Sequence, residues 1–248
     1  MKRIVDIMFS SFGLFLLSPL LAVVCYLIWQ QDNYSPFYIA PRVGENEKIF
    51  KMVKLRSMVV SADKTGVDST SANDSRITPI GHFVLKFKLD EFTQLRNVLM
   101  GDMSLVGPRP NVKRETDLYT DIERKLLSIQ PGITDFSSIV FSDENDILKG
   151  CENPDISYNQ LIRPWKSRLG LLYVENQALI LDFALLFLTL VALVSKDKAL
   201  AGTKKLLLRL NASADVIRVS MRQDLLEPFP PPGSDSIVMS RESVCITS

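Results

Sequence analysis

Apolar residues form one uninterrupted block near the start of the chain. Residues 7–29 contain no charged side chain, whereas Lys2, Arg3 and Asp6 precede them. About 20 helical residues cover the hydrocarbon core of a bilayer, so the block is long enough to cross it. A secretory signal also begins with basic residues, but no small-residue cleavage pattern follows here. The block therefore predicts a membrane helix rather than a cleaved leader.

A proline lies near the middle of this block, in the pair Ser18-Pro19. Proline removes a backbone donor and breaks a helix, and the serine hydroxyl can bond the carbonyl that the break exposes. Two interpretations fit: a kinked spanning helix, and a helix-break-helix hairpin that re-enters the same leaflet. Basic residues on both sides of the block favour the hairpin, because they favour cytoplasmic ends. Arg3 and Asp6 are expected to pair at the membrane surface.

The middle of the chain alternates between short predicted elements. Residues 36–58 predict a β-hairpin around "GENEK", because β-branched and aromatic residues flank a turn. Residues 59–75 are polar and rich in Gly, Ser and Thr, which predicts a mobile loop. Apolar residues at helical spacing predict a helix from Leu89 to Gly101, and residues 112–129 predict a second amphipathic helix.

The last third of the chain is helical in pattern. Residues 153–194 predict helices, and the apolar run 183–194 is too short to span, so it is either core or an interfacial helix. A basic start followed by a Pro- and Ser-rich stretch predicts a short helix and then a disordered terminus. The chain is thus expected to divide into a membrane segment at 1–32, a compact domain at 33–199 and a tail at 200–248.

Composition narrows the chemistry. The chain has 29 basic and 28 acidic residues and a net charge of +1, which gives no support for a nucleic-acid partner. One histidine, His82, argues against catalytic triads and His-rich metal sites. Three separated cysteines form no CxxC pair, which suits a reducing compartment. Catalysis therefore rests on carboxylates, Lys or Arg, hydroxyls, or a metal with oxygen ligands.

An acidic pair, Asp90-Glu91, begins the segment "KLDEFTQLRNVLMGDMSLVGPRP". Alone, such a pair is most simply a helix-capping feature on a solvated surface. Several motifs accompany it in order: "RVG" at 42–44, "KLRSM" at 54–58, "RITPIG" at 76–81 and "PGIT" at 131–134. From residue 2 to about 195 the chain resembles the small monotopic phosphoglycosyl transferases, a family of bacterial sugar transferases.

The resemblance implies a fold and a reaction. The expected fold is α/β but mainly helical: a re-entrant membrane hairpin, a compact cytoplasmic catalytic domain and interfacial amphipathic helices. The expected reaction transfers a sugar 1-phosphate from a UDP-sugar to polyprenyl (undecaprenyl) phosphate and releases UMP. It requires Mg²⁺, and it begins polysaccharide or glycoconjugate assembly at the cytoplasmic face of the bacterial inner membrane. The expected partners are these two substrates and membrane lipid, with a homodimer left open and no nucleic acid.

The resemblance also assigns roles to individual residues. Asp90, held ionised at a helix N-terminus, would attack phosphorus and carry the phosphosugar, while Glu91 binds metal or orients its neighbour. Both carboxylates are candidate Mg²⁺ ligands. Arg109, fixed between two prolines, offers a planar fork to a phosphate. The expected phosphate-binding set is completed by Lys54, Arg56 and Lys86. Lys54 and Arg56 fit a role at the membrane surface equally well.

Three positions depart from the pattern of the family. Leu85 stands where arginine is common, Thr93 where proline is usual, and Ser142 near where many members have a basic residue. Fewer phosphate-binding cations motivate a second hypothesis, a catalytically weak membrane scaffold that recruits glycosyltransferases. A phosphohydrolase that uses the same aspartate is a third. The complete, ordered set of motifs favours the transferase.

Overall fold

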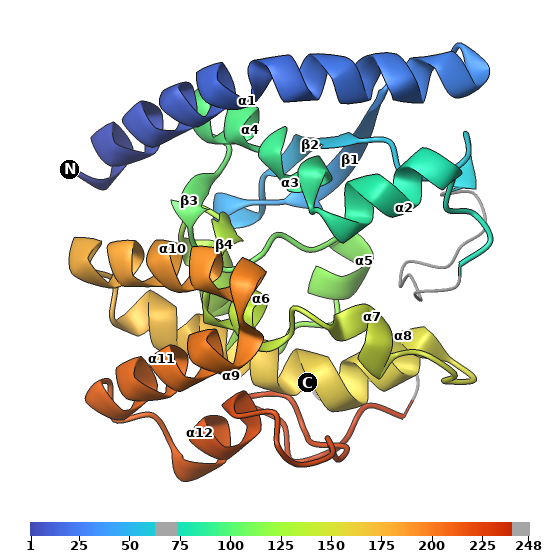
Figure 1. Ribbon diagram of the computed structural model, residues 1–248. Helices are drawn as coiled ribbons and strands as arrows, with labels where there is room; N and C mark the ends of the chain where they lie inside the picture. Colours follow the sequence, from blue (N-terminus) through green and yellow to red (C-terminus); the bar gives the residue numbers. More distant parts are fainter. Residues whose placement is uncertain (63–73, 240–248) are drawn as a thin grey trace.

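The computed structural model describes residues 1–62 and 74–239. One long helix, α1 (Lys2–Asp32), lies along one side of a body of short helices and two small sheets (Figure 1). The mainly helical character expected from the sequence is confirmed. Most of the polar loop predicted at residues 59–75 lies outside the described residues.

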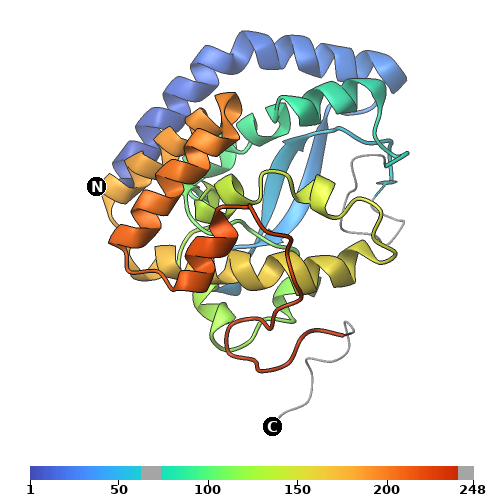
Figure 2. The same cartoon turned by 60° about the horizontal axis from the view of Figure 1, so that its bottom comes forward.

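Helix α1 stays helical through Ser18-Pro19, and Figures 1 and 2 show it as a bent rod. Proline cannot donate to the carbonyl of Phe15, four residues earlier, and the Ser18 hydroxyl donates to that oxygen at 2.8 Å instead. The predicted role of the serine is confirmed. The predicted break in the helix is wrong, because the serine replaces the missing hydrogen bond and the chain bends without turning back.

The N-terminal end of α1 is fixed to the body by charged side chains. Lys2 Nζ lies 3.1 Å from the carboxylate of Asp182. Asp6 is buried and accepts hydrogen bonds from Ser104 Oγ at 2.9 Å and from Leu105 N at 3.1 Å. These contacts join the start of the helix to two distant parts of the chain.

Arg3 does not form the expected pair with Asp6. Its guanidinium donates to the carbonyls of Val98 and Leu99, the latter at 2.7 Å, at the end of α4 (Leu95–Met100). The last carbonyls of a helix lack internal donors and carry partial negative charge, so they compete with a carboxylate for the cation.

The C-terminal end of α1 is fixed as well. Arg56 is buried, and its guanidinium donates to both carboxylate oxygens of Asp32 and to the carbonyl of Ser35 at 2.9 Å. Between the two anchored ends, α1 is apolar and mostly exposed, and by length and composition it is able to cross a membrane. Its large exposed apolar side chains include Ile4, Met8, Phe12, Phe15, Leu16, Leu20, Val23 and Leu27.

The predicted β-hairpin is confirmed. Strand β1 (Phe37–Val43) pairs antiparallel with β2 (Ile49–Leu55), and a 3-10 turn at Glu45–Glu47 closes it. Three short helices follow, and the single helix expected from Leu89 is divided between the last two: α2 (Pro79–Lys86), α3 (Leu89–Phe92) and α4.

A second sheet holds the turn that contains Arg109. Strand β3 (Ser104–Val106) pairs parallel with β4 (Gly132–Thr134). Gly107 and Gly132 meet backbone to backbone, and a Cβ at Gly132 would lie only 2.0 Å from Gly107 N. Because no side chain fits between them, the two glycines allow the Pro108-Arg109-Pro110 turn to pack directly on the start of β4.

The helix predicted at residues 112–129 is two pieces: α5 (Lys113–Thr116) and a 3-10 helix at Glu123–Ser128. Thr120 and Glu123 explain the division. The Thr120 hydroxyl accepts from Glu123 N at 3.1 Å, and the Glu123 carboxylate accepts from Thr120 N at 3.1 Å. This reciprocal capping box starts a new helix rather than continuing the old one.

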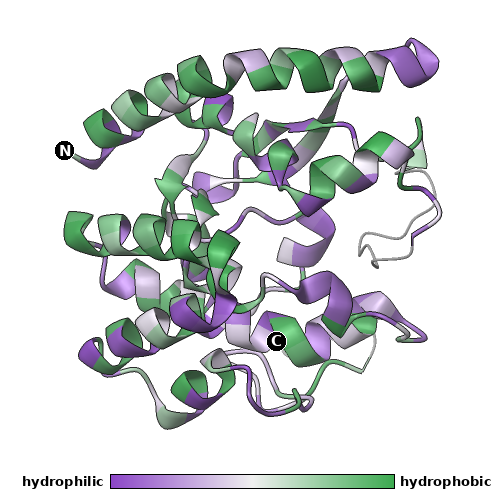
Figure 3. Ribbon diagram, in the orientation of Figure 1, coloured by the Kyte–Doolittle hydropathy of each residue, from purple (hydrophilic) through white to green (hydrophobic). Residues whose placement is uncertain are grey.

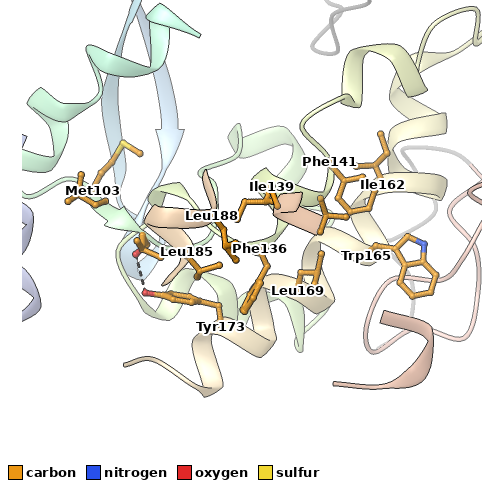
Figure 4. Close-up of a cluster of buried hydrophobic side chains, with 14 of the residues drawn as sticks. Met103, Phe136, Ile139, Phe141, Ile162, Trp165, Leu169, Tyr173, Leu185 and Leu188 are labelled. Atoms are coloured by element: carbon orange, nitrogen blue, oxygen red, sulfur yellow. Dashed lines mark hydrogen bonds between the residues drawn. The ribbon is translucent and has the colours of Figure 1, made fainter. Parts of the chain in front are cut away.

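The helices predicted at residues 153–194 are confirmed, and they supply much of the core. Side chains from α6 (Phe136–Val140), α9 (Arg163–Glu175) and α10 (Leu179–Val194) interdigitate around Phe136, Leu169 and Leu185 (Figure 4). A π-helical turn at Tyr158–Ile162 precedes α9. The helices of this half are α6 (Phe136–Val140), α7 (Glu144–Ile147), α8 (Pro154–Ser157), α9 (Arg163–Glu175), α10 (Leu179–Val194), α11 (Lys196–Arg209) and α12 (Ala214–Ser220).

The segment after α12 is extended and packs across α9 (Figure 2). Pro164 cannot donate to the carbonyl of Gln160, and Phe229 N donates to that oxygen at 3.0 Å. The expected disorder is therefore wrong for residues 221–239, because the tail supplies a donor that the helix lacks. Residues 240–248 lie outside the described part of the chain.

A buried ion pair joins the two halves of this core. The side chains of Arg163 and Glu123 are 2% and 0% exposed, and Arg163 Nε donates to Glu123 Oε1 at 3.0 Å. Ser167 Oγ donates to the same oxygen at 2.6 Å, and Asn159 Oδ1 accepts from Arg163 at 2.9 Å. Every charge in this cluster thus has its own partners.

We expect Arg163→Ala to lower the free energy of unfolding by about 3–5 kcal/mol, because it leaves the Glu123 carboxylate buried without a cation. Arg124→Ala is the matched control: Arg124 pairs with Glu47 at 2.7 Å on the surface, and its loss should cost under about 1 kcal/mol. Urea denaturation of the purified protein in detergent measures both. Equal losses in the two variants would contradict the structural role of the buried pair.

Candidate active site

The two carboxylates of the predicted dyad lie at the start of α3. Lys88 precedes the helix in the left-handed conformation, with φ of 52°, and turns the chain into it. Asp90 is 7% exposed, and the side chain of Glu91 is 23% exposed. Consecutive residues of a helix point about 100° apart. The two carboxylates can therefore meet different partners.

Each carboxylate has its own cation. Lys54, near the end of β2, places Nζ 3.6 Å from Asp90 Oδ2. Arg109, in the turn after β3, places Nη2 2.9 Å from Glu91 Oε1 and donates from Nη1 to the carbonyl of Ile133 at 3.4 Å. Strand β2, helix α3 and the turn after β3 therefore converge on one site and bring together four of the residues predicted from the sequence.

The surroundings shift the pKa values of the two neighbouring carboxyl groups in opposite directions. Burial raises the pKa of Asp90, and Lys54 opposes this only in part. Burial also acts to raise the pKa of Glu91, but Arg109, Lys88 and Lys54 outweigh it and lower that pKa. Paired acids with diverging pKa values are typical of sites that give the two groups different tasks. Glu91 is fixed as an anion, whereas Asp90 is the less stabilised carboxylate.

Burial also shifts the pKa values of the cations at the site. Burial lowers the pKa of Lys54, and the neighbouring positive charges of Arg109 and Arg42 lower it further, against the effect of Asp90. Glu91 raises the pKa of Arg109, which stays charged at every physiological pH. The site thus combines the permanent cation Arg109 with Lys54, whose pKa is lowered by burial and supported by Asp90.

Two buried polar side chains that the sequence reasoning did not assign to the site hold α3 and α4 against the hairpin. The Thr93 hydroxyl lies 2.9 Å from the carbonyls of Val53 and Asp90. Asn97 Oδ1 accepts from Val53 N at 2.9 Å, and its Nδ2 donates to the carbonyl of Lys51 at 2.8 Å. Thr93 and Asn97 are four residues apart, which places them on one helical face after the dyad. This spacing is the sequence signal that would have identified them. Thr93 is the position at which the resemblance leads us to expect proline.

Two predicted phosphate ligands have other contacts. Arg56 is engaged by Asp32 at the end of α1, and Lys86 is exposed with Nζ 5.5 Å from the centre of the Phe87 ring. Within the described residues, no hydrogen bond or ion pair joins either of them to the dyad. Of the positions that depart from the family pattern, Leu85 is partly buried and Ser142 is exposed. The remaining predicted residues, Arg3, Asp6, Ser18 and Pro19, all belong to α1.

A small polar cavity of about 30 Å³ adjoins Arg109. Asn111, Ser137 and Lys166 contribute to its lining, and the ammonium of Lys166 pairs with the Glu144 carboxylate. Glu144 also adds to the negative field that raises the pKa of Arg109. Arg109 therefore lies next to a cavity with polar side chains in its lining, in addition to its contact with Glu91.

The donor set of the dyad suits one kind of metal. Among the described residues, no group of three or more His, Cys, Asp or Glu side chains is arranged to hold an ion. Mg²⁺ needs fewer protein ligands, because it binds one or two carboxylates and completes its shell with substrate phosphates and water. Asp90 and Glu91 fit that requirement, and they do not fit a structural zinc or calcium site.

Comparison with known proteins identifies the family of the chain. The sequence model of a family described as "Bacterial sugar transferase" matches residues 1–196. A putative undecaprenyl-phosphate N-acetylgalactosaminyl 1-phosphate transferase of Bacillus subtilis is 41% identical over 133 residues, 54% of this chain and 70% of that protein.

Longer relatives match over more of this chain. An undecaprenyl-phosphate galactose phosphotransferase of Salmonella typhimurium is 34% identical over 214 residues, 80% of this chain and 41% of that protein. A UDP-glucose:undecaprenyl-phosphate glucose-1-phosphate transferase of Klebsiella pneumoniae is 33% identical over 192 residues, 76% of this chain and 39% of that protein. The chain thus spans about two fifths of the length of these two relatives. The match across residues 1–196 includes α1, the dyad and the Arg109 turn, and the chain belongs to the bacterial sugar transferase family.

Proposed function

We propose that this protein transfers a sugar 1-phosphate from a UDP-sugar to undecaprenyl phosphate and releases UMP. The observation that carries the proposal is the dyad itself, a buried carboxylate held by Lys54 beside a second carboxylate held by Arg109. The names of the relatives support it, because they specify undecaprenyl phosphate and, for the Klebsiella protein, UDP-glucose. The step would begin assembly of a polysaccharide or glycoconjugate.

Asp90 is the nucleophile in this proposal. A carboxylate oxygen of Asp90 attacks the phosphorus that carries the sugar, the bond from that phosphorus to the bridging oxygen breaks, and UMP leaves with the electron pair. The sugar phosphate then remains on Asp90 as an acyl phosphate. An oxygen of the lipid phosphate attacks the same phosphorus and displaces the carboxylate, which regenerates Asp90. Lys54 balances the charge of Asp90 before the attack and lies beside the phosphoryl group after it.

Glu91 and Arg109 hold the diphosphate in place. The ion pair fixes one edge of the guanidinium plane, so the rest of the plane can receive a phosphate in a defined orientation. Mg²⁺, held by Asp90 and Glu91 together with substrate phosphates, would neutralise the diphosphate charge that otherwise repels a carboxylate nucleophile.

The anchoring of α1 supports a re-entrant membrane position at the cytoplasmic face. Both ends of α1 contact the body that holds the dyad, so we propose that both ends lie on the same side of the bilayer. The exposed apolar face of α1 continues onto α10, where the rings of Phe9 and Phe183 lie 6.1 Å apart. This surface would enter one leaflet and leave the dyad level with the lipid phosphates. We propose the cytoplasmic face of the membrane because nucleotide sugars are found in the cytoplasm.

We expect the purified protein, with Mg²⁺, undecaprenyl phosphate and a panel of UDP-sugars, to release UMP only when the lipid is present. Asp90→Asn should lower the rate by at least about a thousandfold, because an amide cannot act as the nucleophile. The variant should remain folded, because asparagine keeps the size of the side chain and Lys54, whose side chain is 23% exposed, keeps access to water. Asp117→Asn, which alters an exposed carboxylate paired with Lys113, is the matched control and should keep the wild-type rate.

Each other outcome of this assay has a definite meaning. UMP release without lipid would indicate a phosphohydrolase. No release with any UDP-sugar would favour the scaffold that recruits glycosyltransferases. A substantial rate in Asp90→Asn would remove this residue from the role of nucleophile while leaving the overall reaction in place.

Arg109→Lys tests the forked contact with phosphate. Lysine keeps the charge but cannot hold Glu91, the carbonyl of Ile133 and a phosphate in one plane, so kcat/KM should fall about tenfold or more, the equivalent of one charge-assisted hydrogen bond. Arg124→Lys, on an exposed ion pair, is the control and should leave the kinetics unchanged. Wild-type kinetics in Arg109→Lys would mean that Arg109 supplies only charge or structure.

A further inference from the structure

The family match ends at residue 196, the first residue of helix α11, and α11 follows α10 with only Ser195 between them. Ser195 Oγ accepts from Lys198 N at 3.4 Å and caps α11. Gly202 of α11 meets Leu188 of α10, where a Cβ on the glycine would lie 2.3 Å from Leu188 Cδ2. The two helices therefore pack closely side by side, and this contact fixes their rotation about their own axes (Figure 1).

Helix α10 presents an apolar face to the outside. Its opposite face, with Leu181, Leu185 and Leu188, is buried in the core. Figure 3 shows α10 as strongly hydrophobic along its length. Its exposed side chains are Ile180 at 85%, Phe183 at 44%, Phe187 at 65%, Leu190 at 64%, Leu193 at 61% and Val194 at 91%.

Helix α11 carries a stripe of cations instead. Lys198, Lys205 and Arg209 are exposed, and they are seven and four residues apart, which places them along one line of a helix. No ion pair with a carboxylate is found for any of the three among the described residues. Lys196 differs, because its Nζ lies 2.6 Å from Asp143. We call Lys198, Lys205 and Arg209 the basic stripe.

The basic stripe runs beside the apolar face of α10. At about 100° per residue, all three cations lie within about 60° of Gly202 around the axis of α11, and Gly202 is the residue that faces α10. The buried face of α11, with Leu200 and Thr203, lies on the far side of the stripe. The outer surface of this helix pair therefore changes from apolar on α10 to cationic on α11 across one seam.

We propose that the basic stripe binds the headgroups of anionic phospholipids. In this arrangement α10 lies in the interface with its apolar side chains among the acyl chains, and the cations of α11 reach the phosphates beside it. The inference rests on the proposed membrane contact of α1 and α10, and it adds a preference for anionic lipid through cations that lie after the family match at residues 1–196. The net charge of the whole chain is only +1, so the attraction must be local.

The test uses the full-length protein in nanodiscs of phosphatidylcholine, with or without phosphatidylglycerol. A bimane fluorophore is attached at Ala201→Cys, an exposed position of α11, in a chain whose three native cysteines are replaced by alanine. Quenching by a lipid with a nitroxide on its headgroup reports how close α11 lies to the membrane surface. We expect stronger quenching with phosphatidylglycerol than without it, and loss of the difference at high salt.

Neutralising the stripe should abolish the lipid preference. Each cation is expected to contribute roughly fivefold to association with an anionic surface, so Lys198→Gln, Lys205→Gln and Arg209→Gln together should bring quenching to the level seen in pure phosphatidylcholine. A control with the same change of charge on other exposed surfaces should keep the wild-type response; it combines Lys48→Gln, Lys125→Gln and Lys149→Gln.

Equal quenching in the two lipid mixtures, or an unchanged response of the triple variant, would overturn the inference. UMP release measured in the same nanodiscs distinguishes failure of the anionic-lipid contact from failure of the proposed reaction. Lipid-dependent release with no preference for phosphatidylglycerol would remove only the anionic-lipid contact. A phosphatidylglycerol preference without any release would support the contact and count against the transferase.

Discussion

The attachment of α1 at both ends is the constraint on which the rest of the structure depends. Lys2 is bound by Asp182 at one end, and Arg56 binds Asp32 at the other. A helix of 31 residues is about 46 Å long, enough to cross a bilayer, but one that is fixed at both ends to the same body must lie along it. Asp6 extends the constraint to the active site, because it binds Ser104 at the start of β3 and the strand leads directly to the Arg109 turn.

The site itself separates two adjacent carboxylates by their environments. Asp90 has a 3.6 Å contact with a lysine whose own pKa burial lowers, whereas Glu91 has a 2.9 Å bond to a permanently charged arginine. The result is one carboxylate fixed in an ion pair and one that is weakly compensated, and the proposed role of Asp90 as nucleophile rests on this difference. The hydroxyl of Thr93 holds the backbone of Asp90 against the hairpin, so this difference is built on rigid elements.

Local patterns and the order of the motifs in the sequence predict part of the fold and part of the site. The hairpin, the helices of residues 153–194, and the grouping of Lys54, Arg109 and the dyad all follow from such patterns. The Thr120–Glu123 capping box was also local, but the apolar spacing of residues 112–129 concealed it.

What sequence reasoning missed depends on partners that are distant in the chain. The tail is ordered because Phe229 N donates a hydrogen bond to the carbonyl of Gln160. Composition cannot indicate such a contact. Arg56 pairs with Asp32 because the end of α1 lies next to the end of β2, whereas the family resemblance suggested a phosphate ligand. The bend at Pro19 was overestimated as a break, although the serine that bridges it was identified.

The side of the membrane on which the two ends of α1 lie is the most direct test of the proposed membrane position. Single cysteines are placed directly after Met1 and at Gln31, in a chain without the native cysteines, and intact cells are treated with a membrane-impermeant maleimide. We expect that neither site is labelled until the inner membrane is permeabilised, because both ends of α1 contact the same body and we propose that this body lies on the cytoplasmic side. Labelling of the N-terminal site in intact cells, with the Gln31 site protected, would show that α1 spans the membrane and would contradict the proposed position.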